Sequence, residues 1–84
     1  KPQPVYPLAS QRARESGTVV LKVLVDAQGR PKSVEVTQSS GHRRLDEAAL
    51  RALREARFRP YLEDGQPREA LVPQVEISFR WVGE

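Results

Sequence analysis

The sequence predicts a small α+β domain in which a three-stranded antiparallel sheet carries two helices on one face. Three observations support this fold class. Residues 75–81 alternate strictly between apolar and polar side chains, which is typical of a strand with one face on a core. A valine- and leucine-rich segment at 18–25 and an alternating segment at 33–37 flank a glycine-containing turn, which predicts a hairpin. Residues 43–57 carry apolar side chains at helical spacing, which predicts an amphipathic helix.

The N-terminal part begins with a proline-rich stretch. Proline disfavours helix in the residue before it, so we expect residues 1–5 to be extended, as the end of a linker. Residues 6–84 are then expected to form the folded domain. Pro7 suits the first position of a helix and Gly17 suits the position just beyond one, which predicts a short helix between them.

The first two strands are expected to form a hairpin. Thr18–Val25 carries Val and Leu on both faces, which favours a central strand. Asp26 can bond the backbone of a turn and Gly29 can adopt a positive φ, so the turn is expected between these two residues. Ser33–Thr37 then returns with its valines facing the core.

The longest helix is predicted from Arg43 to Arg57. Its apolar face is rich in alanine, so the helix can lie close to the sheet. Phe58 is expected to fill the core at the end of this helix, and Pro60 prevents the helix from continuing. Residues 63–67 have the composition of a turn or loop before the last strand.

The last strand, Val75–Trp81, is expected to lie at an edge of the sheet. Because the long helix connects the second strand to the third, the third can return beside the first and give the strand order second, first, third. Pro73 at the entrance lacks a backbone N–H, and prolines in sheets are confined to edges, first residues and bulges. An uncovered edge can capture an extended peptide from a partner, so strand addition is the working hypothesis.

The composition argues against several classes of function. The 84 residues suffice for one domain, and the absence of cysteine excludes disulfides and thiolate chemistry. The net charge of +3 suggests nucleic acid, but acidic and basic residues interleave, as at Glu47 and Arg51, which indicates a solvated helix face. The cluster of Arg54, Arg57 and Arg59 suits the C-terminal end of a helix dipole.

No arrangement of residues in the sequence predicts an enzyme. His42 is the only histidine, and it lies beside Gly41 in a predicted turn that gives a catalytic group no rigid support. Asp46 and Glu47 are adjacent, so a helix directs their side chains apart. The sequence also lacks the ligand spacing of a calcium loop and the glycine-rich loop of a phosphate site. We therefore expect a binding protein without a cofactor or a metal.

Short motifs occur in a distinctive order over nearly the whole chain. They are Gln3-Pro4-Val5-Tyr6-Pro7, Gly17 before a valine-rich strand, Asp26 to Gly29, Ser39-Ser40-Gly41, Leu45-Asp46 with Ala48-Ala49, and Arg57-Phe58-Arg59-Pro60. By these motifs and their order, the chain resembles the TonB C-terminal domain family.

The resemblance implies a periplasmic domain of an energy transducer in Gram-negative bacteria. In that family an N-terminal helix anchors the protein in the inner membrane, where it works with the ExbB and ExbD proton channel. The C-terminal domain binds the TonB box, a short extended segment of outer-membrane receptors for siderophores, haem or vitamin B12. The box adds a strand to the third strand of the sheet, and force rearranges the plug of the receptor.

The resemblance also implies a partner-binding surface. The backbone of residues 75–80 would pair with the box, Gln3 and Pro4 would contact the region beside it, and Tyr6 would pack on the domain or contact the partner. Polar side chains on the solvent face of the strand would tune specificity. The expected partner-binding residues are Gln3, Pro4, Tyr6, Gln74, Val75, Glu76, Ile77, Ser78, Phe79 and Arg80.

Other functions stay open at this point. A TonB paralogue dedicated to haem uptake, or a TolA-like adaptor of the envelope, would share the fold. A basic nucleic-acid-binding domain is the less favoured alternative, and its affinity would fall steeply with salt. For the TonB-type domain we expect no nucleic-acid partner, and a homodimer formed by strand pairing is possible.

Overall fold

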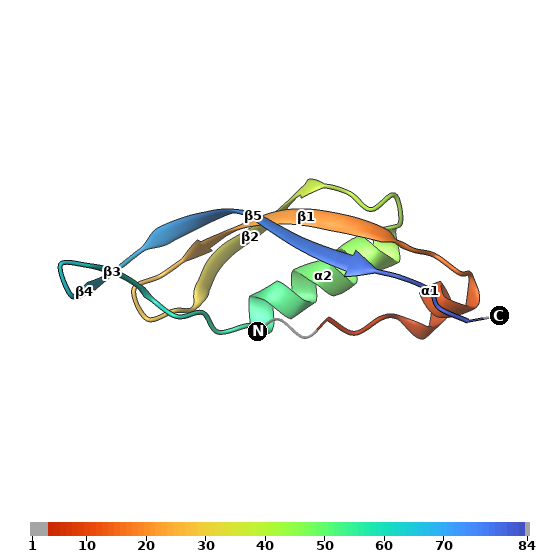
Figure 1. Cartoon of the computed structure of the whole chain (residues 1–84), viewed down its shortest axis with the longest axis horizontal. Coiled ribbons are helices and arrows are strands. Elements are labelled where there is room, and N and C mark those ends of the chain that lie inside the picture. Colours follow the sequence, from red (N-terminus) through yellow and green to blue (C-terminus); the bar gives the residue numbers. More distant parts are fainter. Residues whose placement is uncertain (1–3, 84) are drawn as a thin grey trace.

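The fold is built on one antiparallel sheet whose strands come from both halves of the chain. The computed structural model describes residues 4–83. Strands β1 (Gly17–Val25), β2 (Pro31–Gln38) and β5 (Ala70–Phe79) form a three-stranded sheet in the order β2-β1-β5 (Figure 1). Both pairings are antiparallel, which confirms the sheet predicted from the sequence.

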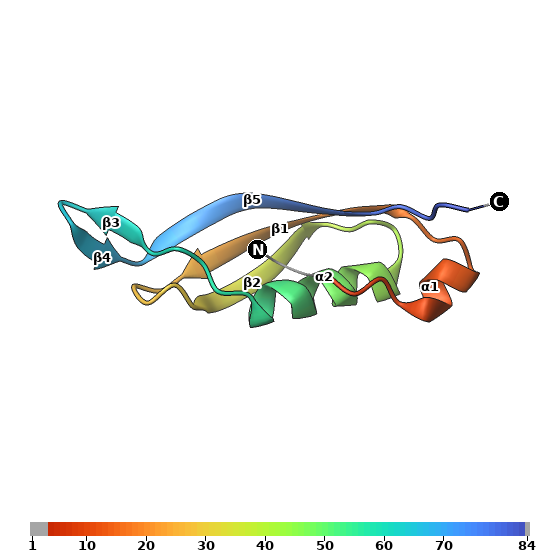
Figure 2. The same ribbon diagram turned by 60° about the horizontal axis from the view of Figure 1, so that its bottom comes forward.

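Both helices lie on the same side of this sheet, as expected. Helix α2 (Arg43–Glu55) runs across the sheet face and packs mainly beneath β2 and β1. The short helix α1 (Leu8–Arg12) lies on the same side but beyond the end of the sheet (Figure 2). The other face of the sheet carries no helix of the described chain (Figure 2).

The hydrophobic core lies between the sheet and α2. Alternate residues of β1, beginning with Val19, are buried, because β1 has a neighbour on each side and a helix below. Ala49 and Ala52 are buried on the inner face of α2, so short side chains face the sheet there. The buried cluster consists of Val19, Leu21, Val23, Val25, Leu45, Ala49, Leu53, Ile77 and Phe79.

Strand β5 differs in extent from the strand predicted at its position. It begins at Ala70 rather than Val75, and it ends at Phe79, so Arg80 and Trp81 lie outside it. Leu21 pairs with Val75 and Val23 pairs with Val72, which leaves Pro73 and Gln74 together opposite a single residue of β1. This is a β-bulge, and a bulge on an edge strand is a place where a proline is tolerated inside a sheet.

A second, two-stranded hairpin was missed by the sequence prediction, which placed a turn or loop there. Strands β3 (Tyr61–Glu63) and β4 (Gln66–Arg68) pair around Asp64 and Gly65, which both have positive φ, 53° and 78°. Asp-Gly suits a two-residue hairpin loop of this kind. Every residue of both strands is exposed, so neither shows the buried alternation by which a strand is recognised.

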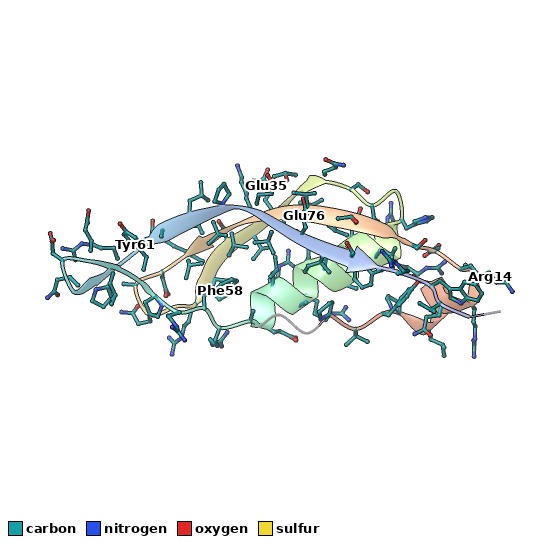
Figure 3. The ribbon with its side chains drawn as sticks, in the orientation of Figure 1. Arg14, Glu35, Phe58, Tyr61 and Glu76 are labelled. Carbon is teal, nitrogen blue, oxygen red and sulfur yellow. The ribbon has the colours of Figure 1, made fainter. Side chains whose placement is uncertain are left out.

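The turn between β1 and β2 packs against the segment that follows α2. Asp26 Oδ1 accepts hydrogen bonds from the backbone N–H groups of Gln28 and Arg30, each at 2.9 Å, which shapes the turn as expected. Gly29 has a φ of 85°, and its carbonyl accepts a hydrogen bond of 2.7 Å from the N–H of Phe58. The Phe58 ring is half-buried against the core cluster (Figure 3), so its predicted core position is confirmed in part.

The loop between β2 and α2 is held by a carboxylate near the start of the helix. Asp46 accepts hydrogen bonds from the Ser40 N–H at 2.9 Å, from Ser40 Oγ at 2.8 Å and from Ser39 Oγ. Partial burial opposes ionisation, but these three donors outweigh it and lower the pKa of Asp46. Asp46 therefore fixes the path by which the chain leaves the sheet and enters α2.

Candidate peptide-binding edge

The candidate site is the side of β5 that faces away from β1. Within residues 4–83, β5 pairs with β1 alone, so its other edge has no strand beside it (Figure 1). From Val75 to Phe79 the pairing with β1 is regular, with five consecutive partners from Leu21 back to Gly17. This five-residue stretch is the longest regularly paired part of β5, and it covers most of the segment predicted to bind a partner.

The inner face of this stretch holds the edge in place. Ile77 and Phe79 are buried, and Val75 is half-buried against the core. A slip of one residue would turn these side chains out to solvent, so their burial fixes the register of β5. The free edge is therefore presented on a rigid support, with its position set by the core.

The outer face of the stretch carries polar side chains, as the alternation predicts. The Ser78 hydroxyl lies 2.9 Å from the Thr18 hydroxyl of β1, and Gln74 Nε2 donates a hydrogen bond of 3.0 Å to Glu76 Oε2. Gln74, Glu76 and Ser78 are all exposed. Arg80 is also exposed, but it lies beyond the last residue of β5 and adds nothing to the paired strand.

The N-terminal segment passes beneath the C-terminal end of β5. The Tyr6 ring meets the Phe79 ring edge to face, with centroids 5.5 Å apart and an interplanar angle of 64°. The Tyr6 hydroxyl donates a hydrogen bond to the Glu15 carbonyl. Pro4 is exposed, and Gln3 lies outside the described residues. The structure thus brings Tyr6 into contact with a residue of the candidate edge strand, where it packs on the domain.

A second set of contacts fastens α1 and the C-terminal tail to this end of the molecule. Glu15 Oε2 accepts a hydrogen bond from Arg44 Nη2 at 2.8 Å, with His42 Nδ1 at 3.7 Å, and mainly the Arg44 contact lowers the pKa of Glu15. The Arg14 guanidinium lies 4.5 Å from the centroid of the Trp81 ring. This cation–π contact was not predicted, because nothing in the sequence pairs a residue after α1 with one after β5.

The extension of the free edge toward Ala70 was also missed. Before the bulge the inner-facing positions are the even ones, Ala70 and Val72, whereas after it they are the odd ones. The alternation therefore changes phase at Pro73. That phase change was the available signal for a longer strand interrupted by one extra residue.

The predicted arginine cluster lies around the C-terminal end of α2. Arg54, Arg57 and Arg59 are exposed around the end of α2, where Arg57 Nη1 donates to the Ala56 carbonyl at 2.9 Å. Within residues 4–83, no three His, Asp or Glu side chains come together in a way that would hold a metal ion. In the same residues no helix has the length and apolar character needed to cross a bilayer.

In residues 4–83 the chain forms a small α+β domain whose long edge strand has no strand beside it, an arrangement that in other domains can accept an extended peptide. Comparison with known families identifies the module. Residues 2–81 match the model of the Gram-negative bacterial TonB protein C-terminal region, so the chain belongs to the TonB C-terminal family. This family consists of transducer proteins rather than enzymes.

Individual relatives agree with this family. Protein TonB of Vibrio cholerae serotype O1 is 37% identical over 94% of the chain, and Protein TonB of Xanthomonas campestris pv. campestris is 41% identical over 90%. Protein TonB of Neisseria meningitidis serogroup C is 47% identical over 68%. The chain spans 31%, 34% and 20% of these three proteins respectively, so it corresponds to a minor part of each.

A solved structure supports the fold independently. The structure titled "Molecular characterization of the tonb2 protein from vibrio anguillarum" superposes with a TM-score of 0.72 at 23% identity. The match covers 96% of this chain and 76% of that one. At this identity the likeness concerns the fold, and it confirms the α+β architecture predicted from the sequence.

Proposed function

We propose that this chain is the C-terminal domain of a TonB-type energy transducer and binds the TonB box of an outer-membrane receptor by strand addition to β5. The whole protein would be anchored in the inner membrane by an N-terminal helix and would place this domain in the periplasm. ExbB and ExbD would supply the coupling to the proton motive force, for uptake of siderophores, haem or vitamin B12. Residues 1–5 would be the end of the linker to the anchor.

The observation that carries the proposal is the regular free edge of β5 between Val75 and Phe79. Its core-facing side chains are fixed, so an incoming strand meets a backbone that is already ordered and avoids much of the entropy cost of binding. Side-chain contacts of the peptide would add to about four to six new backbone hydrogen bonds, which at roughly 1 kcal/mol each, and before the cost of association, correspond to a weak affinity of about 0.04–1 mM. Such an affinity suits a partner that must be released after each cycle.

The first test is a titration of isotope-labelled domain with a synthetic TonB-box peptide, followed by backbone amide shifts. We expect the largest shifts at residues 75–79 and on the N-terminal segment near Pro4. The opposite edge strand, β2, serves as an internal control and should shift little. A folded, monomeric domain without shifts on β5 at millimolar peptide would contradict strand addition and favour a different partner, as for a TolA-like adaptor.

Proline substitution gives a second test on the same strand. In an antiparallel pair, neighbouring residues direct their N–H groups alternately to the partner strand and to the free side. Ile77→Pro and Ser78→Pro therefore differ, because only one of them removes an N–H that faces the free edge. We expect a folded proline variant that has lost peptide binding, while Thr37→Pro on β2 retains it. Full binding by every folded β5 variant would contradict the proposal.

The same edge can pair with a second copy of the chain, so we propose that homodimers form at high concentration. A dimer built on β5 would hide the surface that the peptide needs. Peptide should then dissociate the dimer, and analytical ultracentrifugation with and without peptide measures this. Dimers that persist unchanged at saturating peptide would place the contact between copies elsewhere.

A further inference from the structure

The outer face of the free edge carries one carboxylate with no counter-charge in the described chain. Glu76 is exposed, and no Lys, Arg or His nitrogen of residues 4–83 lies within 4.0 Å of its carboxylate. Its side-chain partner is Gln74, whose Nε2 donates a neutral hydrogen bond of 3.0 Å. The negative charge of Glu76 is therefore available to a group that arrives from outside.

The neighbours of Glu76 on β1 explain why its carboxylate has no ion-pair partner in the described chain. Its direct partner in the ladder is Val20, which is apolar. Lys22 lies two residues further along β1, but its Nζ is 3.5 Å from Glu35 Oε1 of β2. Residues directly opposite each other have Cβ atoms about 4.5–5.5 Å apart, against about 7–8 Å for diagonal ones. The direct position still open to Glu76 is the one on the free edge.

We propose that the peptide added to β5 carries a lysine or arginine directly opposite Glu76, on the solvent face of the extended sheet. The residues on either side of this basic residue would lie beside Val75 and Ile77, so they would be apolar. This inference rests on the proposed strand addition, and it narrows the partner to an extended, alternating segment with one basic side chain. Glu76 thereby becomes the residue that selects among such segments.

Other charges of the domain do not produce the same preference. Arg80 is four residues from Glu76, which is about 13 Å along a strand and beyond the Debye length of about 8 Å at physiological salt. The net charge of the chain is +3, so long-range attraction would favour an acidic peptide over a basic one. A preference for a basic residue would therefore come from a local contact and not from the overall field.

The test uses the TonB-box peptide of the previous experiment as host, with each position replaced in turn by lysine or by glutamate. At one position we expect the lysine peptide to bind about three- to tenfold tighter than the glutamate peptide, as for an attractive pair compared with a like-charge pair on a sheet surface. Glu76→Gln should remove this preference and Glu76→Lys should reverse it. Amide shifts at residues 75–79 report that each peptide still binds at the edge.

The double variant Lys22→Gln/Glu35→Gln is the matched control, because Glu35→Gln alone would free Lys22, the diagonal neighbour of Glu76. Glu35 and Glu76 both lie on the face of the sheet away from α2, but Glu35 belongs to β2 at the other edge (Figure 3). The double variant should keep the lysine preference of the natural chain. Edge binding without any charge preference would overturn the role of Glu76 and leave strand addition standing. Absence of binding by the host peptide itself would overturn strand addition, and this inference with it.

Discussion

Gly29→Ala should destabilise the domain far more than a glycine-to-alanine change in an exposed turn. Gly29 has a φ of 85°, a conformation that costs an L-residue about 1 kcal/mol. A Cβ at this position would lie 2.1 Å from the Phe58 carbonyl oxygen, which is backbone and cannot rotate away. The segment after α2 must then move by roughly 1 Å to restore ordinary contact, which is the kind of overpacking that costs about 1–3 kcal/mol.

That movement also breaks the hydrogen bond from Phe58 N–H to the Gly29 carbonyl, worth about 1 kcal/mol. The three contributions together are about 3–5 kcal/mol, which is most of the stability expected for a domain of this size. Gly65→Ala isolates the backbone contribution, because Gly65 has a φ of 78° and a Cβ there would meet no atom within 4 Å. We expect the free energy of unfolding of the Gly65→Ala control to fall by only about 1 kcal/mol.

Urea denaturation at 25 °C, followed by far-ultraviolet circular dichroism, measures both losses. We expect a gap of about 2–4 kcal/mol between the free energies of unfolding of the two variants, from the contact and hydrogen-bond contributions above. A Gly29→Ala chain that is already unfolded in buffer, beside a folded Gly65→Ala chain, would agree with it. Equal losses at the two positions would refute it, because they would mean that the turn does not pack against Phe58.

Two other perturbations test how the ends of the elements are fastened. Asp46→Ala should cost about 1–2 kcal/mol at pH 7 because three donors lose their acceptor. Since the folded pKa of Asp46 is lowered, its contribution is full above the unfolded value of about 3.9 and fades as pH falls through the folded pKa. Urea curves of the natural chain and the variant should therefore converge below about pH 4, and a constant gap would contradict this account. Tyr6→Ala should lower the free energy of unfolding by about 1–3 kcal/mol, because it removes both the ring pair with Phe79 and the hydroxyl hydrogen bond. Tyr6→Phe removes only the hydrogen bond, so it should lower the free energy of unfolding by about 0.5–1.5 kcal/mol. If Tyr6→Ala left the free energy of unfolding unchanged, the N-terminal segment would not unfold together with the rest of the domain.

The strand order and the amphipathic helix could be predicted because both depend on patterns that burial imposes. Every second residue of β1 had to be apolar, and the helical connection between β2 and β5 left a place for β5 beside β1. The β3–β4 hairpin could not be found in this way. Its strands are short and exposed, so they are defined by their pairing and not by burial. The one sequence signal for this hairpin was the Asp64-Gly65 turn.

The candidate site was predicted in position but not in its full extent or its surroundings. The segment 75–79 was visible because its alternation is regular, whereas the change of phase at Pro73 concealed Ala70–Val72. The contacts of Tyr6 with Phe79 and of Arg14 with Trp81 join residues from opposite ends of the chain. Such pairs form because folding brings the two ends of the chain together, and no local sequence pattern predicts which residues then meet.

The bulge at Pro73 and Gln74 also limits how the domain can aggregate. A long, flat edge strand templates further strands, and proteins protect such edges with prolines and bulges that interrupt the row of hydrogen-bonding groups. Here the interruption divides a ten-residue strand and leaves five residues in regular register with β1. In the proposed binding mode a short peptide would find enough backbone to pair with, whereas an indefinite stack of copies would not. The bulge that shortens the regular edge thus works against edge-to-edge pairing of copies of the domain.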